Sequence, residues 1–585
     1  MKFLKTFLIP VIMCSSFSSC LDMEPLDQLG GDAMWTSNAD FEQFANNFYG
    51  WTRDFSSAVM NDAPHADKRS DLLMPYDGYN LYSHGANTIP GSDGNYTGNY
   101  SNIRRTNLLL QNAANYSNQD GIKQYVGEAY FFRAYCYFEL LQMYGDAIII
   151  KNPLDITSPE LQVRQNDRSE VADLVIDDLN NAIDCLPSYK DLGGAGYARV
   201  SKEAAQAFLS RVALYEGTWQ KFRVGSNTER ITNLLQIAAN AAKAVIDSKQ
   251  FYLFGTDGES KQLGLAAQKY MFILEDEQSN PLNIKKSANH EYIFARCHNT
   301  TLSPIGSNIT KACLNNALWV TRKMADLYLC QDGLPISKSE MFNKERKTVI
   351  AEFENRDNRM QYTLLKPGVR YYSNAEGKYR LWNDVEDAKQ GDIYDPKLGN
   401  GTHYANQKWC TERQVQDTKE GYDFPIIRYA EVLLNYAEAV YELNSNVNGD
   451  LTNASEVDNA LNISLNLVRT RINPDMPKLT VAFANTHGLS LQEEIRRERT
   501  VELYMEGFRI DDLKRWKTAE QEMPQNLLGI MKVGEYSVVQ NTSVDADNNV
   551  IVDQGRRWES KNYLLPLPSD QLQLNTNLQQ NPGWK

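Results

Sequence analysis

The sequence predicts a mainly α-helical protein built from successive pairs of helices, with one loop-rich segment inserted between them. Three observations lead to this prediction. Apolar residues recur at helical spacing through several long segments. Those segments follow one another in pairs at intervals of roughly 35–45 residues. Residues 249–423, in contrast, contain few long periodic runs. With 585 residues, 42% of them hydrophobic, the chain can bury a large core.

The first long helix is expected over residues 124–144. Its polar residues form only a narrow stripe through Glu128, Glu139 and Gln142, so most of its circumference should be buried. Arg133 lies well away from that stripe, on the apolar side. Because an unpaired charge is costly in a core, we expect Arg133 to contact a carboxylate.

The second helix of this pair is expected over residues 168–187. Asp167 and Glu170 precede it at the spacing of a capping box, and Pro187 ends it. Further helices are predicted over residues 201–219, 231–246, 427–443, 455–471 and 490–516. Small alanines at the expected crossing points and the repeated pairing resemble degenerate tetratricopeptide units, which stack into a superhelix.

Loops and turns occupy much of the remaining chain. Residues 249–423 and 60–100 are rich in glycine, asparagine, aspartate and aromatic residues, and binding specificity usually resides in such loops. Alternating apolar residues on both sides of Asp547-Asn548-Asn549 predict a small β-hairpin between residues 534 and 552. We therefore divide the body into residues 20–248, the insert 249–423, and residues 424–585.

The N-terminus has the organisation of a bacterial export signal. Lys2 and Lys5 precede an apolar run at residues 7–13, and small serines lead to Cys20. We interpret residues 1–19 as a lipoprotein signal peptide and Cys20 as the acylated first residue of the mature chain, residues 20–585. Two or three acyl chains give stable anchoring where one is marginal. The alternative is that Cys20 is an ordinary residue of a cleaved secretory peptide.

Charge and motif content exclude several classes of function. The formal charge is −14, and loss of the two lysines in residues 1–19 would make it −16, so nucleic acid is not an expected partner. GxSxG, HExxH and phosphate-binding GxxxxGK motifs are absent from the sequence. No cofactor or metal is therefore expected, and the six cysteines beyond Cys20 leave disulfide bonding undecided. A glycosidase needs only two carboxylates, so a surface glycosidase stays an alternative.

An ordered set of short motifs runs through nearly the whole chain. They are YSNIRRTN at 100–107, GEAYFFRA at 127–134, DG at 332–333, NRDNR at 355–359, IRYAEVLLNYAEA at 427–439, ER to DLKRW at 498–516, LPLP at 565–568 and QNPGW at 580–584. Together with the lipoprotein-like start, this set resembles the SusD/RagB family of outer-membrane nutrient-binding lipoproteins. The acidic residues after Cys20 likewise resemble the surface-export signal of certain Gram-negative lipoproteins.

The resemblance implies a fold and a function. The fold would be a tetratricopeptide-like helical superhelix with an inserted loop-rich subdomain. The protein would be anchored in the outer membrane facing the cell exterior, would capture an oligosaccharide without catalysis, and would pass it to a SusC-like TonB-dependent β-barrel transporter. Because some members of the family serve peptide uptake, a peptide ligand is an alternative, as is a pure protein scaffold.

Most of the charged motif residues are expected to be structural. Their helical spacing suits ion pairs between packed helices. The residues concerned are Arg428, Glu431, Glu438, Arg499, Glu502, Glu506, Arg509 and Asp512. They identify the fold and say little about the ligand.

Sugar-binding residues are expected in the loop that ends near residue 100. A pyranose presents an apolar face and a rim of hydroxyls, which an aromatic platform and nearby amides can match. The candidate ligand contacts are Tyr79, Asn80, Tyr82, Tyr96, Asn99, Trp319 and Trp382. Glycan-binding members of the family resemble this chain in placing an aromatic residue and an amide where Tyr96 and Asn99 stand. We expect these two residues just ahead of a helix, exposed and replaceable without loss of stability. The alternative for each tyrosine is that it only pins the loop to the body.

Overall fold

The computed structural model describes most of the body of the chain. The described residues are 34–75, 80–223, 227–276, 278–307, 309–313, 318–369, 396–398, 401–411, 418–540 and 543–585. The predictions for the signal peptide, Cys20, Tyr79 and Trp382 lie outside them.

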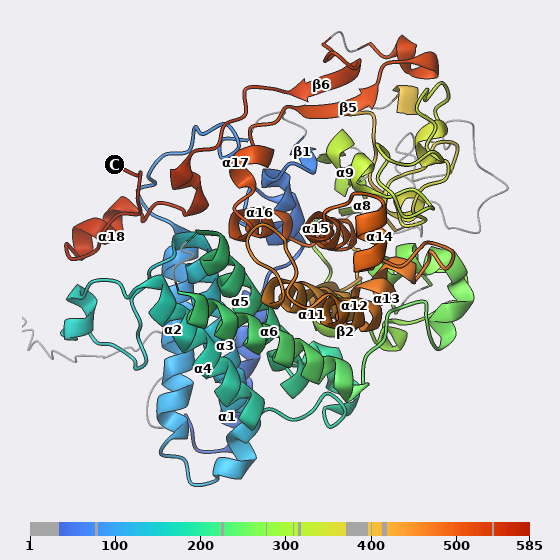
Figure 1. The fold of residues 1–585 in the computed structure, drawn as a ribbon. Coiled ribbons are helices and arrows are strands. Elements are labelled where there is room, and N and C mark those ends of the chain that lie inside the picture. The colour runs from blue at the N-terminus through green and yellow to red at the C-terminus, as the bar shows by residue number, and fades with distance from the viewer. Residues whose placement is uncertain are drawn as a thin grey trace, which may run out of the picture.

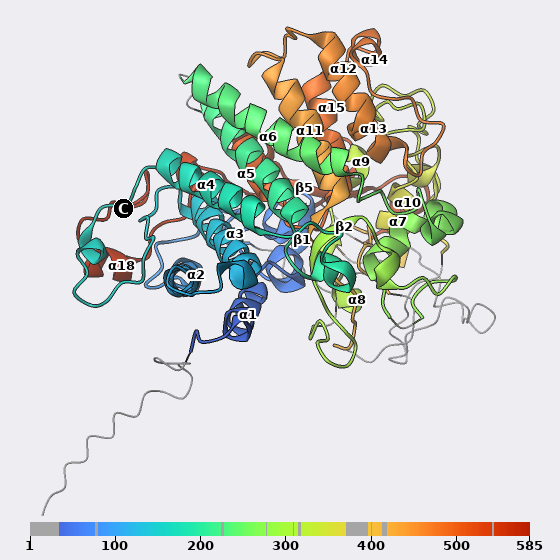
Figure 2. The same cartoon turned by 90° about the horizontal axis from the view of Figure 1, so that it is seen from below.

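Long helices dominate the N-terminal part. They are α1 (Asn38–Asn46), α2 (Gly94–Ala113), α3 (Gln119–Tyr144), α4 (Arg168–Cys185), α5 (Lys202–Arg223) and α6 (Thr228–Ser248). From α2 to α6 each helix packs against the next one in the chain (Figures 1 and 2). The expected capping box of α4 is formed, with the Asp167 backbone N–H donating to Glu170 Oε2 at 3.0 Å.

The C-terminal helices continue this stack. They are α11 (Tyr429–Leu443), α12 (Ala454–Ile463), α13 (Leu465–Thr470), α14 (Val481–Thr486), α15 (Leu491–Glu502), α16 (Arg509–Arg515), α17 (Ala519–Glu522) and α18 (Ser569–Leu574). Helix α11 packs against both α5 and α6, so helices far apart in sequence form one body in the centre of Figure 1. The prediction of a mainly α-helical superhelix is confirmed.

Short elements fill the segment between the two groups of helices. Its helices are α7 (Ala267–Tyr270), α8 (Ile309–Lys311), α9 (Arg322–Leu327) and α10 (Met360–Thr363). The strands of the molecule are β1 (Leu73–Pro75), β2 (Tyr292–Arg296), β3 (Leu318–Val320), β4 (Phe424–Arg428), β5 (Leu527–Met531) and β6 (Asn549–Asp553). They form the antiparallel pairs β1–β3, β2–β4 and β5–β6. The pairs β1–β3 and β2–β4 join strands of the insert to segments outside it, whereas β5 and β6 both belong to the C-terminal part.

Two of the predicted long helices are broken. The helix expected over 455–471 is interrupted at Ser464, whose φ of −139° and ψ of −93° are not helical. The helix expected over 490–516 stops at Glu502, because Met505 and Gly507 have positive φ angles of 58° and 77°. Gly507 passes so close to Ala58 that a side-chain Cβ there would lie 3.0 Å from the Ala58 Cβ. The break is therefore imposed by a tertiary contact that sequence periodicity does not reveal.

The predicted hairpin is also rearranged. Strand β6 pairs with β5, not with residues 536–539, and Leu528 lies opposite Ile551. Residues Gly534–Val538 instead form a 3₁₀ turn that binds residues 347–349: the Glu535 N–H donates to the Lys347 carbonyl at 2.9 Å. A contact with a distant loop thus replaces the expected local pairing.

Arg133 on α3 is buried and paired, as predicted. Its Nε and Nη2 atoms donate to the two carboxylate oxygens of Asp178 on α4, at 2.8 and 2.7 Å. A third donor, Nη1, binds the Asn107 side chain on α2 at 2.9 Å. One side chain therefore fixes three successive helices together.

A buried ionic network joins β4, α15 and the inserted segment. Arg428 is 1% exposed and contacts Glu291 at 2.7 Å, Glu502 at 2.8 Å and Glu506 at 2.7 Å. Burial opposes the ionisation of Glu502, but Arg471 and Arg428 outweigh it and lower the pKa of that carboxyl. Other motif residues form the pairs Arg211–Glu431, Arg515–Glu438, Arg499–Asp512 and Arg509–Asp71. The predicted structural role of these charges is confirmed.

Candidate functional site

Helix α2 begins earlier than expected. The Asp93 side chain accepts a hydrogen bond from the Asn95 backbone N–H at 2.9 Å and so caps the helix, which starts at Gly94. Tyr96 and Asn99 consequently lie within its first turns, not ahead of it. Tyr96 is only 4% exposed, which corrects the expectation of an exposed residue, and Asn99 is half-buried, with its amide donating to the Asn95 carbonyl at 2.7 Å.

Asn80 and Tyr82 anchor the segment before α2. Both are buried. The Asn80 amide donates to Asp62 Oδ1 at 2.8 Å, and its side-chain oxygen accepts from the Tyr82 N–H. The Tyr82 hydroxyl donates to the Asn562 carbonyl at 2.8 Å, and its ring packs edge-on against Trp558. Burial also raises the pKa of this hydroxyl. These contacts favour the structural alternative for Tyr82, and the side chain of Asn80 is engaged within the same segment.

Trp319 lies on a different part of the surface. It belongs to β3, opposite Met74 of β1, and is half-buried. Its indole ring packs on Gly401, where a Cβ atom would come within 1.9 Å of the ring, so this close approach requires glycine. Trp319 is not among the residues that line the two depressions bordered by Tyr96 and Tyr82, which are described below.

A groove of about 450 Å³ runs beside the first turns of α2, and we call it the α2 groove. It is lined by Tyr96, Thr97, Tyr100, Ile148, Ile150, Glu160, Leu161, Gln162, Gln571, Leu574, Asn575 and Leu578. The rings of Tyr96 and Tyr100 lie 5.0 Å apart on one wall. The Tyr100 hydroxyl accepts from the Ile148 N–H at 2.8 Å, which fixes its ring.

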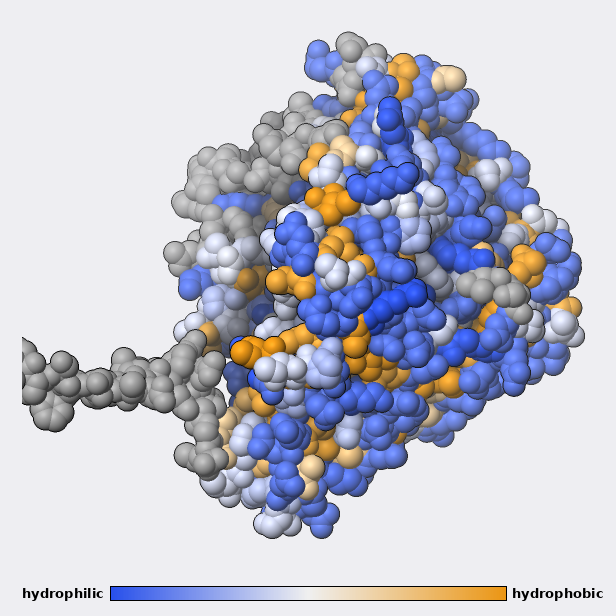
Figure 3. Space-filling model, turned by 90° about the vertical axis from the view of Figure 1, so that its left-hand side faces the viewer, coloured by the Kyte–Doolittle hydropathy of each residue, from blue (hydrophilic) through white to orange (hydrophobic). Residues whose placement is uncertain are grey.

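The α2 groove combines apolar surface with available polar groups. Leu574 on α18 is 69% exposed, and Figure 3 shows hydrophobic patches among hydrophilic surface on the face that carries α18. Within the described residues, the side chains of Glu160 and Gln571 make no hydrogen bond. An aromatic and aliphatic wall next to a free carboxylate and a free amide is an arrangement that suits a sugar ring.

A second depression, of about 380 Å³, lies across the first turn of α2, and we call it the polar hollow. Its lining includes Asp62, Arg69, Tyr82, Asp93 and Asn95. Its two carboxylates already have partners: Arg69 Nε donates to Asp62 at 2.8 Å, and the Tyr144 hydroxyl donates to Asp93 at 2.6 Å. The polar hollow therefore has fewer groups to offer a ligand than the α2 groove.

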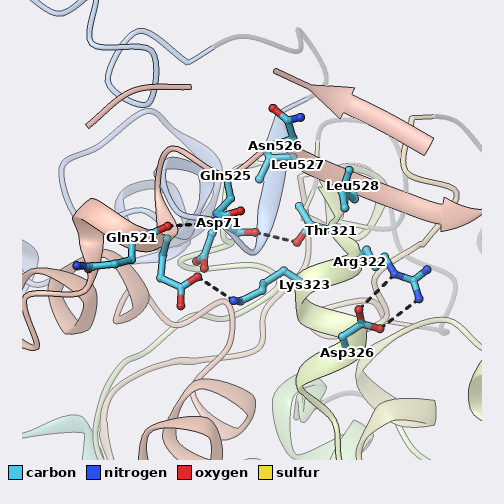
Figure 4. Close-up of a pocket in the computed structure, with 11 residues that line it drawn as sticks. Asp71, Thr321, Arg322, Lys323, Asp326, Gln521, Gln525, Asn526, Leu527 and Leu528 are labelled. Carbon is cyan, nitrogen blue, oxygen red and sulfur yellow. Dashed lines mark hydrogen bonds and ion pairs between the residues drawn. The ribbon is translucent and has the colours of Figure 1, made fainter. Parts of the chain in front are cut away.

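A third depression, of about 430 Å³, lies between α9, α17 and β5, and we call it the charged cleft (Figure 4). It is lined by Asp71, Thr321, Arg322, Lys323, Asp326, Gln521, Glu522, Gln525, Asn526, Leu527 and Leu528. Its ion pairs are Lys323–Glu522 at 2.8 Å, Arg322–Asp326 at 3.2 Å and Arg509–Asp71 at 2.7 Å.

Burial acts differently on two carboxyl groups of the charged cleft. It opposes the ionisation of Asp71, but Arg509 outweighs it and lowers the pKa of Asp71 to about 2. Burial raises the pKa of Asp326, although Arg322 acts in the opposite direction. The sequence reasoning missed this cleft because its residues come from three distant segments, and no local motif connects them.

The comparisons with known proteins support the fold and the motifs. The sequence model of the SusD family matches residues 279–584. The chain belongs to the SusD family. A second family model, described as starch-binding and associating with the outer membrane, matches residues 21–214.

Similar proteins share the architecture across nearly the whole chain. A SusD-like protein from Formosa agariphila is 23% identical over 545 residues, which cover 88% of this chain and 92% of the relative. A crystal structure of a SusD-like protein from Bacteroides fragilis, 20% identical, superimposes with a TM-score of 0.70 over 96% of this chain and 100% of its own. A SusD-like carbohydrate-binding protein from the same organism gives 0.70 and 20% identity, over 93% and 99% of the two chains. At these identities the solved structures establish the shared fold.

None of the described helices has both the length and the apolar character needed to cross a membrane.

Proposed function

We propose that this protein is a non-catalytic, surface-exposed lipoprotein that binds an oligosaccharide and passes it to a SusC-like TonB-dependent transporter. The observation that carries this proposal is membership of the SusD family. Two further findings support it: one matching family is described as starch-binding and associating with the outer membrane, and a carbohydrate-binding relative shares the fold.

The α2 groove is our candidate for the sugar-binding site. The half-exposed ring of Tyr100 and the exposed Leu574 would cover the apolar face of a pyranose, while Gln571 and Glu160 would bind its hydroxyls. Tyr96 packs beside Tyr100 on the same wall and is too deeply buried to form the platform itself. Contacts by Tyr79 and Asn99, and by Trp319 and Trp382 at a second aromatic wall, stay predictions.

The binding proposal is tested on the full-length protein in detergent with a glycan array, followed by calorimetric titration of the best ligand. Replacing Gln571 by alanine should weaken binding about fivefold, since one hydrogen bond contributes on the order of 1 kcal/mol. Gln573→Ala on the same helix is the matched control, because Gln573 is exposed and does not line the groove. Equal affinities of the two variants would place the site elsewhere.

The same titrations separate the alternatives. Binding of peptides with no glycan binding would favour the peptide-uptake alternative. Release of new reducing ends from the glycan would reveal a glycosidase.

We also propose that Cys20 carries the lipid anchor. The match to the outer-membrane family model starts at residue 21, directly after this cysteine. The variant Cys20→Ala should lose fatty-acid labelling and leave the membrane fraction, because the acyl chains supply the anchoring free energy. Labelled, membrane-bound Cys20→Ala protein would contradict the proposal.

The transporter partnership predicts co-purification with a large outer-membrane β-barrel in mild detergent. A lipid anchor alone gives no specificity, so a protein interface of at least about 1,000 Å² should hold the pair. Recovery of the protein alone across several detergents would contradict this partnership and favour the scaffold or enzyme alternatives.

A further inference from the structure

The charged cleft is separate from the α2 groove and is built differently. Its walls come from α9, α17 and β5, and none of the residues that line it is aromatic. In Figure 4 Gln521, Gln525 and Asn526 lie along one side of the cleft, and Arg322 and Asp326 lie across from them. The cleft therefore offers hydrogen-bonding groups without a stacking platform.

Several polar groups of the cleft are accessible. Gln521 and Asn526 are exposed, and their side-chain amides make no hydrogen bond within the described residues. The Lys323 and Glu522 side chains are 41% and 29% exposed although they pair with each other. Each of these four groups can add a hydrogen bond to a ligand without giving up an existing partner.

The charge balance indicates which ligand fits. Lys323, Arg322 and Asp71 each have an oppositely charged partner, so the cleft has no uncompensated cation or anion to offer. A charged ligand would have to break one of these pairs and leave its partner without a counter-charge. A neutral hydroxyl can both donate to Glu522 and accept from Lys323 while the pair stays intact, and hydrogen bonds to charged groups are the stronger kind.

Residues that are close in sequence border the three depressions. Neighbouring residues of α2 line the first two, since Asn95 borders the polar hollow and Tyr96 borders the α2 groove. In the same way Arg69 lines the polar hollow and Asp71, two residues later, lines the charged cleft. A long chain of sugars that follows these residues would reach the cleft from the groove by way of the hollow.

We propose that the charged cleft is a second saccharide-binding site, which takes a neutral sugar of the same polysaccharide chain that occupies the α2 groove. This inference rests on the proposed function. Two linked contacts bind a long chain more tightly than either does alone, because the second contact forms at a high effective concentration. A short fragment occupies the groove only and gains nothing from the cleft.

The test uses full-length protein in affinity gel electrophoresis with three neutral polysaccharides, amylopectin, xyloglucan and galactomannan, and with acidic alginate and polygalacturonate. The double variant Gln521→Ala/Asn526→Ala removes the two free amides at exposed positions. Its matched control is Gln236→Ala/Asn240→Ala, which removes an exposed glutamine and asparagine from α6. Calorimetry then measures the affinity of each protein for the polysaccharide that retards the parent and for a trisaccharide fragment of it.

We expect at least one neutral polysaccharide to retard the parent protein in the gel. The cleft variant should bind that polysaccharide about fivefold more weakly than the parent does. The trisaccharide should bind parent, cleft variant and control equally. If the cleft variant binds the polysaccharide with the same affinity as the parent, the second site is overturned and the proposed function stays intact. Preference of the parent for alginate or polygalacturonate would overturn the neutral specificity. No retardation by any of the five would overturn the proposed function, and the second site with it.

Discussion

The buried network around Arg428 and the charged cleft contain the same kinds of charged residue, but these residues have different roles. In the network Arg428 is 1% exposed and contacts three glutamates. In the cleft Lys323 is 41% exposed and pairs with Glu522. The network has no surface for a ligand and holds helices together, whereas the exposed Lys323–Glu522 pair of the cleft contributes little to stability and can be reached. Burial, not residue type, separates structural charges from those available for binding.

The largest expected effect comes from breaking the network. Arg428→Met should lower the free energy of unfolding by about 3–5 kcal/mol, because it leaves buried carboxylates without their partner. The same change in the cleft, Lys323→Met, should cost at most about 1 kcal/mol, since exposed pairs contribute little. Urea unfolding of both variants checks this contrast. Similar losses at the two sites would contradict the distinction drawn from burial.

Tyr96 provides the next largest effect and tests the boundary between core and groove. Tyr96→Ala should lower the free energy of unfolding by roughly 3 kcal/mol, because it opens a cavity beside Tyr100 and Tyr144. Tyr96→Phe keeps the ring and should cost only about 1 kcal/mol. Thermal unfolding of both variants measures the difference. If Tyr96→Ala were as stable as the parent, the ring would not be part of the core.

The pH dependence of stability gives a smaller, graded effect. Burial opposes the ionisation of Glu438, but Arg515 outweighs it and lowers the pKa of this carboxyl to about 2. A depressed pKa stabilises the fold above the unfolded value near pH 4.3, and this stabilisation is lost as the pH falls to about 2. In Glu438→Gln the free energy of unfolding should therefore rise less steeply with pH in that window, by up to about 1.4 kcal/mol per pH unit.

This prediction is checked by urea unfolding at a series of acidic pH values. Subtracting the parent's curve of unfolding free energy against pH removes the contributions of other titrating groups. One such group is Asp67, because burial raises its pKa to about 7. Identical slopes for Glu438→Gln and the parent would contradict the assigned role of Glu438.

Much of the fold could be predicted from sequence because its signals are local. The capping box at Asp167 and Glu170 and the apolar period of α3 require only neighbouring residues. Arg133 was informative for the same reason, since a charge on a buried face demands a partner. The break at Gly507 could not be predicted, because it depends on the approach of Ala58 from the far end of the chain.

The candidate site was harder to predict because its features are tertiary. The composition of the segment before α2 drew attention to the end of that helix beside which the α2 groove lies. It could not show that Tyr82 is held by Asn562, which is 480 residues away in the sequence. Nor could it show that α18 supplies Gln571 and Leu574 to the wall facing Tyr100. Recognising these residues requires the packed C-terminal segment.

The central claim is that the accessible surface around α2, and not the buried charges, holds the glycan. A crystal structure of the protein with its best-binding oligosaccharide tests this most directly. We predict a sugar ring in the α2 groove, with its apolar face on Tyr100 and a hydroxyl within hydrogen-bonding distance of the Gln571 amide. An oligosaccharide bound elsewhere, with the α2 groove empty, would contradict the account.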